Sequence, residues 1–249
     1  QASTFGSTDS TTGEWKINTA PSLTYGTNGF FILKDTNSGT DQSPNSNNWT
    51  VAGGTLTKTE DCPSNVFATL NPLNVPTSNG PTFANGNTTS TSSTTSGSYK
   101  WGGCTTLGMT SGKFYCEAKA TVDSTYSRNV IGITGDSANI ARANGSILNG
   151  THSWGWYSEN GQISGNGNAD IQSGTAYGTG DIVMMALDLD NNKLYFGKNG
   201  SWVYSGVPTS GSTGTGAISI IAANTTNDGA YFFAQTDDTG TTSPSKFEF

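Results

Sequence analysis

The chain has 249 residues, of which 12% are charged, and it carries a formal net charge of −7 with only eleven Lys and Arg. Charged residues are about half as frequent as the roughly 25% of typical soluble domains, and the scattered cations exclude a surface that binds nucleic acid. No apolar run approaches the ~20 residues of a membrane helix. Six Trp, nine Tyr and eleven Phe argue against disorder, because disordered segments are poor in aromatic residues. Composition therefore favours a folded, turn-rich β protein.

The N-terminal section predicts short strands separated by polar loops. Residues 1–13 form a Ser/Thr/Gly leader without an initiating Met or the basic and apolar regions of a signal peptide, so we expect the sequence to be the ordered part of a longer chain or a processed product. Phe30–Leu33 and Asn48–Val51 predict strands on either side of a polar loop at residues 35–48. We assign residues 1–80 to an extended β and loop segment that serves assembly.

Residues 81–236 predict a series of strands, and residues 237–249 a C-terminal tail. In Phe114–Ala120, alternation places Tyr115, Glu117 and Lys119 outward and the intervening side chains, Cys116 included, inward. Further buried strands and hairpins are predicted at Asn129–Thr134, Ser153–Ser158 with Gly161–Ser164, Ala217–Ala223 and Ala230–Ala234.

The stretch from Asp181 to Trp202 predicts a three-stranded meander around which the rest of the chain packs. Ile182–Leu187 is an unbroken apolar run of the length of a buried strand. Asn191-Asn192 predicts a two-residue hairpin turn, because asparagine tolerates positive φ. Asn199-Gly200 predicts a second such turn, and Trp202 begins the third strand.

These segments resemble successive motifs of the SPRY domain over roughly residues 82–235. The matching residues are Gly180 to Val183, Leu187-Asp188, Leu194, Phe196 and Asn199-Gly200, preceded by Ser111 to Glu117, Val130 to Ile133 and Trp154 to Trp156. The resemblance implies an all-β fold: a bent antiparallel β-sandwich of the SPRY/concanavalin-like (jelly-roll) type. It also implies that loops at one edge of the sandwich bind partners and that the domain is not catalytic.

A second resemblance covers roughly residues 13–90. The succession YGTNGFF, KDTNSGTD, NNWTV, VFATLNPL and TFANGN is similar to a module of tailed-bacteriophage structural proteins, which are described as tail fibre, tail or virion-associated proteins. It implies a location on the virion, in a surface appendage, and a homo-oligomer, with a trimer favoured. The implied partners are other virion subunits and a glycan or protein of the host surface.

The candidate ligand-binding residues combine aromatic rings with polar groups at the predicted loop edge. They are Tyr126, Arg128, Trp154, Trp156, Tyr157 and Asn160. Aromatic rings stack on sugars while the polar side chains bind hydroxyls, which suits a host glycan, although peptide binding fits the same residues. Trp154 and Trp156 share one face of their strand, which favours a place in the core for at least one of them. A free lectin-like or peptide-binding module is the alternative function, and a glycan depolymerase is a third.

Catalytic and metal sites are not expected, so the sequence predicts neither an enzyme nor a cofactor. The five Glu form no pair of closely spaced acids such as glycosidases need, and Asp188 and Asp190 border a predicted turn. Asp188-x-Asp190-x-Asn192 begins like a calcium loop, but Lys193 and Asn199 stand where Gly and the bidentate Glu belong. Zinc is not expected, since there is no CxxC motif and a single His.

Three cysteines, Cys62, Cys104 and Cys116, are too few for a disulfide framework. Cys116 faces inward on its predicted strand and is interpreted as a small buried apolar residue. A bridge between Cys104 and Cys116 on neighbouring strands is the alternative.

Overall fold

The computed structural model describes residues 2–8, 10, 15–18, 21–33, 38–54, 56, 68–77, 80–92, 101–122, 129–141, 146–237 and 246–249. The chain forms two compact units, residues 1–68 and residues 69–249, which are called the N-terminal unit and the sandwich unit below.

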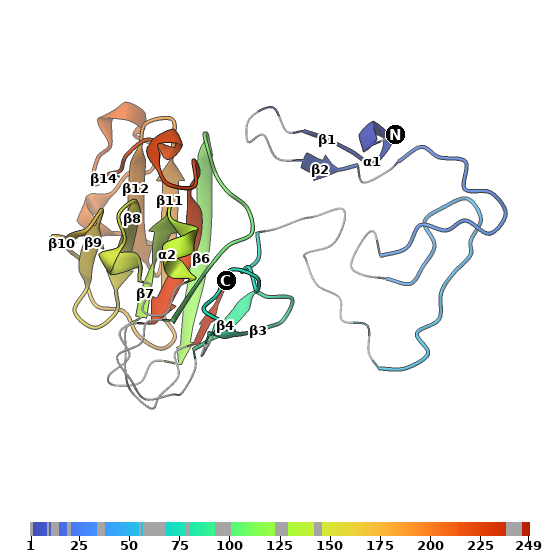
Figure 1. Cartoon of the computed structure of the whole chain (residues 1–249), viewed down its shortest axis with the longest axis horizontal. Helices are drawn as coiled ribbons and strands as arrows, with labels where there is room; N and C mark the ends of the chain where they lie inside the picture. Colours follow the sequence, from blue (N-terminus) through green and yellow to red (C-terminus); the bar gives the residue numbers. More distant parts are fainter. Residues whose placement is uncertain are drawn as a thin grey trace. The chain divides into compact units, whose positions relative to one another are not determined.

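The N-terminal unit has little regular structure in its described part (Figure 1). It contains a one-turn helix, α1 (Ala2–Phe5), and a two-stranded ribbon in which β1 (Gly6–Thr8) pairs antiparallel with β2 (Trp15–Ile17).

The strands predicted at Phe30–Leu33 and Asn48–Val51 are absent, so these two predictions are wrong. The Phe31 amide donates instead to the Asp41 carboxylate at 2.7 Å, and the Phe31 carbonyl accepts from the Gln42 amide at 2.7 Å. These bonds close a loop and engage the backbone groups that a β-ladder would need.

The sandwich unit consists of two antiparallel sheets, which confirms the predicted all-β sandwich (Figure 1). The first sheet has the order β10-β9-β8-β7-β15-β5, and the second has the order β13-β12-β11-β6-β16-β4-β3, with β14 paired to β12. The strands are β3 (Thr82–Ala84), β4 (Thr89–Thr91), β5 (Trp101–Cys104), β6 (Lys113–Val122), β7 (Asn129–Thr134), β8 (Ser153–Tyr157), β9 (Gln162–Gly165), β10 (Asn168–Ser173), β11 (Ile182–Asp188), β12 (Lys193–Lys198), β13 (Ser201–Trp202), β14 (Ile218–Ser219), β15 (Phe232–Asp237) and β16 (Lys246–Glu248). The short helices of this unit are α2 (Ser137–Ile140), η1 (Ile147–Asn149), η2 (Val203–Ser205), η3 (Gly211–Thr213) and η4 (Ala223–Thr225).

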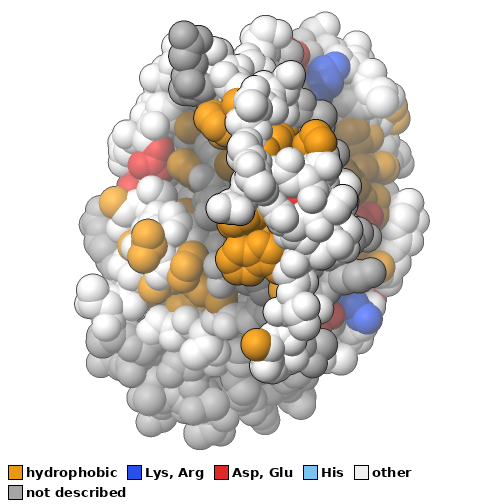
Figure 2. Space-filling view, turned by 90° about the vertical axis from the view of Figure 1, so that its right-hand side faces the viewer, with side chains coloured by type: hydrophobic (Ala, Val, Ile, Leu, Met, Phe, Trp, Pro, Cys, Tyr) orange, Lys and Arg blue, Asp and Glu red, His pale blue; other side chains and the backbone are white. Residues whose placement is uncertain are grey.

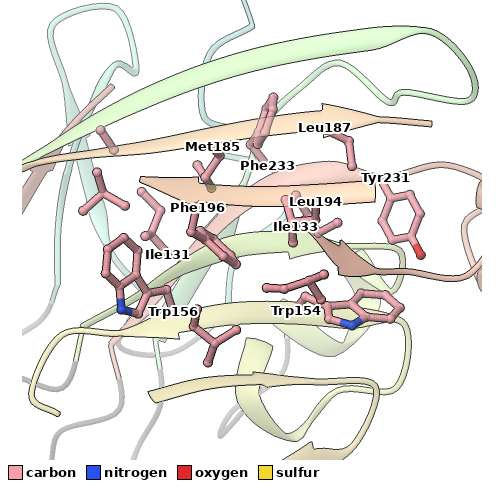
Figure 3. Packing of buried hydrophobic residues seen from close by; sticks show 14 of the residues in the cluster. Ile131, Ile133, Trp154, Trp156, Met185, Leu187, Leu194, Phe196, Tyr231 and Phe233 are labelled. Carbon is pink, nitrogen blue, oxygen red and sulfur yellow. The ribbon is translucent and has the colours of Figure 1, made fainter. Parts of the chain in front are cut away.

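The core lies between the two sheets and follows from the period of two in the strands. Side chains from β11 and β12 point toward side chains from β7, β8 and the β15 region, as Figure 3 shows. Ring contacts hold the core together: the ring centroids of Trp156 and Phe196, which belong to opposite sheets, are 5.8 Å apart, and those of Trp154 and Tyr231 are 5.9 Å apart. Burial of each such side chain stabilises the fold by roughly 1.5–3 kcal/mol.

The predicted meander is present, but its first turn is longer than expected. The last pair of the β11–β12 hairpin is Asp188 with Lys193, which leaves a four-residue loop in place of the predicted two-residue turn at Asn191-Asn192. Leu189 causes the extension, because it is buried in the core and its amide donates to the Gly112 carbonyl at 2.9 Å.

The second turn of the meander is confirmed. Lys198 pairs with Ser201, and Asn199 and Gly200 between them have φ values of 50° and 82°. Two positive φ values at the centre of a two-residue loop match the twist of the flanking strands.

The boundaries of the sandwich differ from those predicted at residues 81 and 236. Upstream, Leu70 forms a bridge with Thr105, and the Asn71 amide donates to the Cys104 carbonyl at 2.8 Å. Downstream, β16 lies between β6 and β4, so part of the predicted tail at residues 237–249 is a strand inside the sheet. Phe247 explains this placement, because it pairs with the small Ala120 and is fully buried.

Candidate binding site

Strand β8 places three of the predicted ligand-binding residues in the interior. Trp154, Trp156 and Tyr157 are only 3%, 0% and 5% exposed. Trp154 and Trp156 point between the sheets (Figure 3), while Tyr157 packs in a smaller cluster with Val130 and Ile147. All three therefore belong to the core, which corrects their assignment to an exposed binding surface, and only Trp154 also lines a cleft.

Of the other three predicted residues, only Asn160 belongs to the part of the chain that the structure describes. Asn160 is exposed at the β8–β9 turn, where its side-chain carbonyl accepts from the Gln162 amide at 2.9 Å. Tyr126 and Arg128 lie outside the described residues.

A cleft of about 500 Å³ opens beside Trp154. Its lining comes from β8, the β9–β10 turn, β10 and the segment around β14: Trp154, Gly165, Asn166, Ile171, Gln172 and residues 217–221. None of these lining residues is charged. The Gln172 side-chain oxygen is buried and has no hydrogen-bond donor in the described chain. The cleft therefore suits an uncharged group that brings an apolar surface.

Three aromatic side chains, called the aromatic row below, lie on the outer face of the second sheet. Tyr115 of β6 and Tyr195 of β12 flank Ala186 of β11 in register, and the Trp202 ring packs edge-on against both, at centroid distances of 6.2 and 6.4 Å. Space for the Trp202 ring comes from Gly197, where a Cβ would lie 3.0 Å from Trp202 Cε3.

The aromatic row is graded in exposure, so one end of it is available to a ligand. Tyr195 is buried, Trp202 is half-buried and Tyr115 is 54% exposed. Alternation along β6 had predicted that Tyr115 and Glu117 point outward, which is confirmed. No local sequence pattern predicts that Trp202 lies beside Tyr115, since the two residues meet only through the strand order β6-β11-β12-β13.

Charged groups border the exposed end of the row. The Tyr115 hydroxyl donates to the Glu117 carboxylate. Partial burial, together with this bond and the negative charge of Glu117, raises the Tyr115 pKa to about 12. Lys113 pairs with Asp188 at 3.5 Å along the same face. An aromatic surface beside carboxylate and ammonium groups can stack on a sugar ring and hydrogen-bond its hydroxyls. Charged residues are only 12% of the chain, and few red and blue side chains appear on the face that Figure 2 shows.

The two acids of the β11–β12 loop have structural partners. Asp188 is 2% exposed, and its carboxylate accepts from the Asn191 amide at 3.1 Å and from the Asn191 side chain at 2.9 Å. The Asp190 carboxylate accepts from the Gly112 amide at 2.8 Å. Within the described residues, no group of three or more His, Cys, Asp and Glu is placed to hold a metal ion.

Cys104 and Cys116 are free thiols in different sheets, so the alternative of a bridge between them is wrong. Cys104 is buried, and Cys116 faces inward as predicted and is half-buried against the core. Burial raises the pKa of Cys104 to about 11 and that of Cys116 to about 12. Cys62 lies outside the described residues, and no described helix is long and apolar enough to cross a membrane.

Comparison with solved structures agrees with this architecture. The chain is similar to the SPRY domain of human HERC1 with a TM-score of 0.53 and 16% identity, covering 72% of this chain and 95% of that domain. The sandwich has a SPRY-like fold. A second human SPRY domain matches the SPRY-like sandwich with a TM-score of 0.48 and 13% identity, over 67% of this chain and 93% of that one. No family model and no curated protein matches the sequence.

Proposed function

We propose that this chain is a non-catalytic structural and binding subunit of a bacteriophage virion, in a tail fibre or another surface appendage, and that its SPRY-like sandwich binds a host-surface glycan. The observation that carries the binding role is the aromatic row, whose exposed end at Tyr115 lies beside Glu117 on a rigid sheet. The virion role is supported by the resemblance of residues 13–90 to tailed-phage structural proteins.

A glycan fits the aromatic row better than it fits the cleft beside Trp154. Most of the residues that line the cleft are apolar, so few side chains there can pair with sugar hydroxyls, and an unpaired hydroxyl costs free energy. At the row, the Tyr115 ring is accessible to solvent and Glu117 supplies carboxylate oxygens as acceptors. The non-catalytic role is supported by Asp188 and Asp190, whose carboxylates are both engaged in holding a loop.

A titration of the full chain with purified host surface polysaccharide tests the binding role. Tyr115→Ala should weaken binding by on the order of tenfold, the effect expected from losing one stacking contact. Ile171→Ser is the matched control, because Ile171 is an exposed apolar residue on the other sheet, where it lines the cleft. Equal binding by wild type and Tyr115→Ala, or release of shortened polysaccharide by the protein, would contradict the proposal. Immunogold labelling of purified virions tests the location.

The cleft favours a second candidate function, a free peptide-binding module. It adjoins β10, the edge strand of the first sheet, where an extended peptide could pair while inserting an apolar side chain. In that case Ile171→Ser would weaken binding of the partner and Tyr115→Ala would not.

A further inference from the structure

Strand β6 has a neighbouring strand along its whole first half on one side only. Toward β11 the pairing is unbroken from Lys113 to Lys119, without a bulge. On the other side, within the described residues, β16 pairs with β6 no further than Lys119, and no other strand lies next to β6 there. Residues 113–117, on the side of β6 that faces away from β11, therefore form a free strand edge, which is called the open edge below.

The ladder with β11 determines where the backbone groups of the open edge point. At one end of the ladder, the Gly112 carbonyl accepts from the Leu189 amide at 2.9 Å. At the other end, the Ala120 amide donates to the Asp181 carbonyl at 3.0 Å. In an antiparallel ladder every second residue bonds to the same neighbour, so the even-numbered residues from 112 to 120 bond to β11. The amides and carbonyls of the odd-numbered residues point away from β11.

The open edge thus presents three amides and three carbonyls, those of Lys113, Tyr115 and Glu117. The side chains of these residues are exposed, and that of Tyr115 is 54% exposed. The Cys116 thiol lies 3.7 Å from the Glu117 carbonyl and is at most a weak donor to it. A row of backbone groups in this state is a template for the pairing of a further strand.

The open edge lacks the protection that the other edges of the two sheets have. Strands β3, β5, β13 and β14 have only two to four residues, and the pairing of β10 is interrupted by a register shift. Short or bulged edge strands are less regular templates for a further strand. The open edge is longer and belongs to a regular strand, so it is the edge of the described sandwich that best fits an added strand.

The side chains of the open edge define the chemistry of the strand that fits it. Lys113 and Glu117 carry opposite charges at its two ends. On the inward face, Phe114 and Cys116 are only half-buried against the core. An antiparallel partner therefore suits the order basic, apolar, any residue, apolar and acidic, because its charged residues would face Glu117 and then Lys113. Its two apolar residues would cover the half-buried side chains.

We propose that the open edge binds an extended segment of a partner polypeptide with this alternation, which adds to the second sheet as an antiparallel strand beside β6. The site goes beyond the proposed function, because backbone groups at the edge of the sheet bind the partner. A second copy of this chain fits less well. In a two-fold pairing centred on Tyr115, Lys119 of one copy would face Ser111 of the other, so β16 beside Lys119 would meet the bend that precedes β6.

Amide hydrogen exchange of the full chain tests the open edge before any partner is added. The amides of Lys113, Tyr115 and Glu117 should exchange faster than those of Phe114 and Cys116, which bond to β11. Equal protection of the two sets would mean that the edge is covered. Protection of the three edge amides that rises with protein concentration would assign the edge to a second copy. Either result would overturn the inference.

A peptide with the sequence Arg-Val-Thr-Val-Glu and capped ends is the probe for the partner. It should slow the exchange of the three edge amides in a saturable manner and leave the amides of β10 unchanged. N-methylation of its central Thr removes the N–H that faces β6 and should weaken binding by on the order of tenfold or more. N-methylation of its second Val is the matched control, because that N–H points away from β6, and it should change the dissociation constant by less than about threefold. No saturable binding of the unmodified peptide, or equal binding of the two N-methylated peptides, would overturn the inference.

Two substitutions test the open edge from the side of the protein. Tyr115→Pro removes an amide that points away from β11, so the chain should fold but no longer bind the peptide. Cys116→Pro is the matched control, because it removes an amide that bonds to β11 and should lower the unfolding temperature. Undiminished peptide binding by Tyr115→Pro would count against the open edge.

Polysaccharide binding separates this inference from the proposed function. A chain that binds the peptide but no polysaccharide counts against the proposed function alone. A chain that binds polysaccharide but not the peptide counts against the open edge alone.

Discussion

Asp190 and Gly112 are 78 residues apart in the sequence, yet the Asp190 carboxylate accepts a hydrogen bond from the Gly112 amide at 2.8 Å. The Gly112 carbonyl in turn accepts from the Leu189 amide at 2.9 Å. The loop between β11 and β12 is thereby fixed to the turn that begins β6. These three strands belong to the sheet on whose outer face Tyr115 and Trp202 lie, so the two bonds help to hold the aromatic row in place.

Asp190→Ala should destabilise the protein by about 1 kcal/mol, the usual loss when a hydrogen bond to a charged acceptor is removed at a partly solvated position. Urea unfolding followed by tryptophan fluorescence measures the change. Asp190→Asn keeps a side-chain oxygen at the same place and should recover most of the loss. No difference between the Ala and Asn variants would show that the Gly112 contact contributes nothing.

The same loop shows which structural features local sequence could predict. Asn199-Gly200 forms the expected turn because its signal lies within four residues. Asn191-Asn192 carries a similar signal, but burial of Leu189 and the contacts with Gly112 override it. Phe30–Leu33 has the composition of a strand but does not form one, because the Phe31 amide donates to the Asp41 carboxylate instead of to a neighbouring strand.

The candidate site was harder to predict than the fold. The alternation of β6 and β8 gives the direction of each side chain correctly, including the shared inward face of Trp154 and Trp156. Which outward residues become neighbours depends on strand order, and Trp202 reaches Tyr115 only because β11 and β12 lie between their strands. The period of two therefore predicts which face of the strand a side chain takes, whereas the neighbours that it meets on that face depend on long-range strand pairing.

Acid should loosen the N-terminal unit through Asp41. Desolvation raises the pKa of this carboxyl, but the bonds from Phe31, Ser43 and Asn47 outweigh it and lower the pKa from 3.8 to about 2. A group whose pKa is lower in the folded state stabilises the fold above its unfolded pKa, and this contribution is lost as the pH falls. The stabilisation by Asp41 is therefore lost in the pH window from 3.8 down to about 2.

Amide hydrogen exchange at Phe31, Ser43 and Asn47 measures this loss, and protection of the three amides should decline together through that window. Asp41→Asn should exchange faster at neutral pH and show no such transition. Protection that is insensitive to acid in the wild type would mean that Asp41 does not hold the loop.

Gly165 should tolerate no side chain. A Cβ at this position would lie 2.0 Å from Trp154 Cδ1, and Trp154 is packed in the core, so Gly165→Ala forces the ring or the strand to move. Overpacking of this kind costs about 1–3 kcal/mol. Gly174→Ala is the graded control, because its Cβ would lie 3.2 Å from the Trp156 ring and should cost less. Thermal unfolding ranks the two variants, and an equal or reversed ranking would contradict the close packing of Gly165 against Trp154.

The two described cysteines should be unreactive in the native protein. A thiol reacts as its thiolate, and burial raises the pKa of Cys104 to about 11 and of Cys116 to about 12, which leaves almost no thiolate at neutral pH. In a Cys62→Ser background, iodoacetamide should label neither residue in the folded chain and both in denaturant, as read by mass spectrometry of the intact protein. The half-buried Cys116 is the sharper test, because its neighbour Glu117 adds a negative charge that opposes ionisation. Rapid native labelling of Cys116 but not Cys104 would mean that β6 opens at its inward face, and that the sheet carrying Tyr115 is less rigid than the proposed binding role requires.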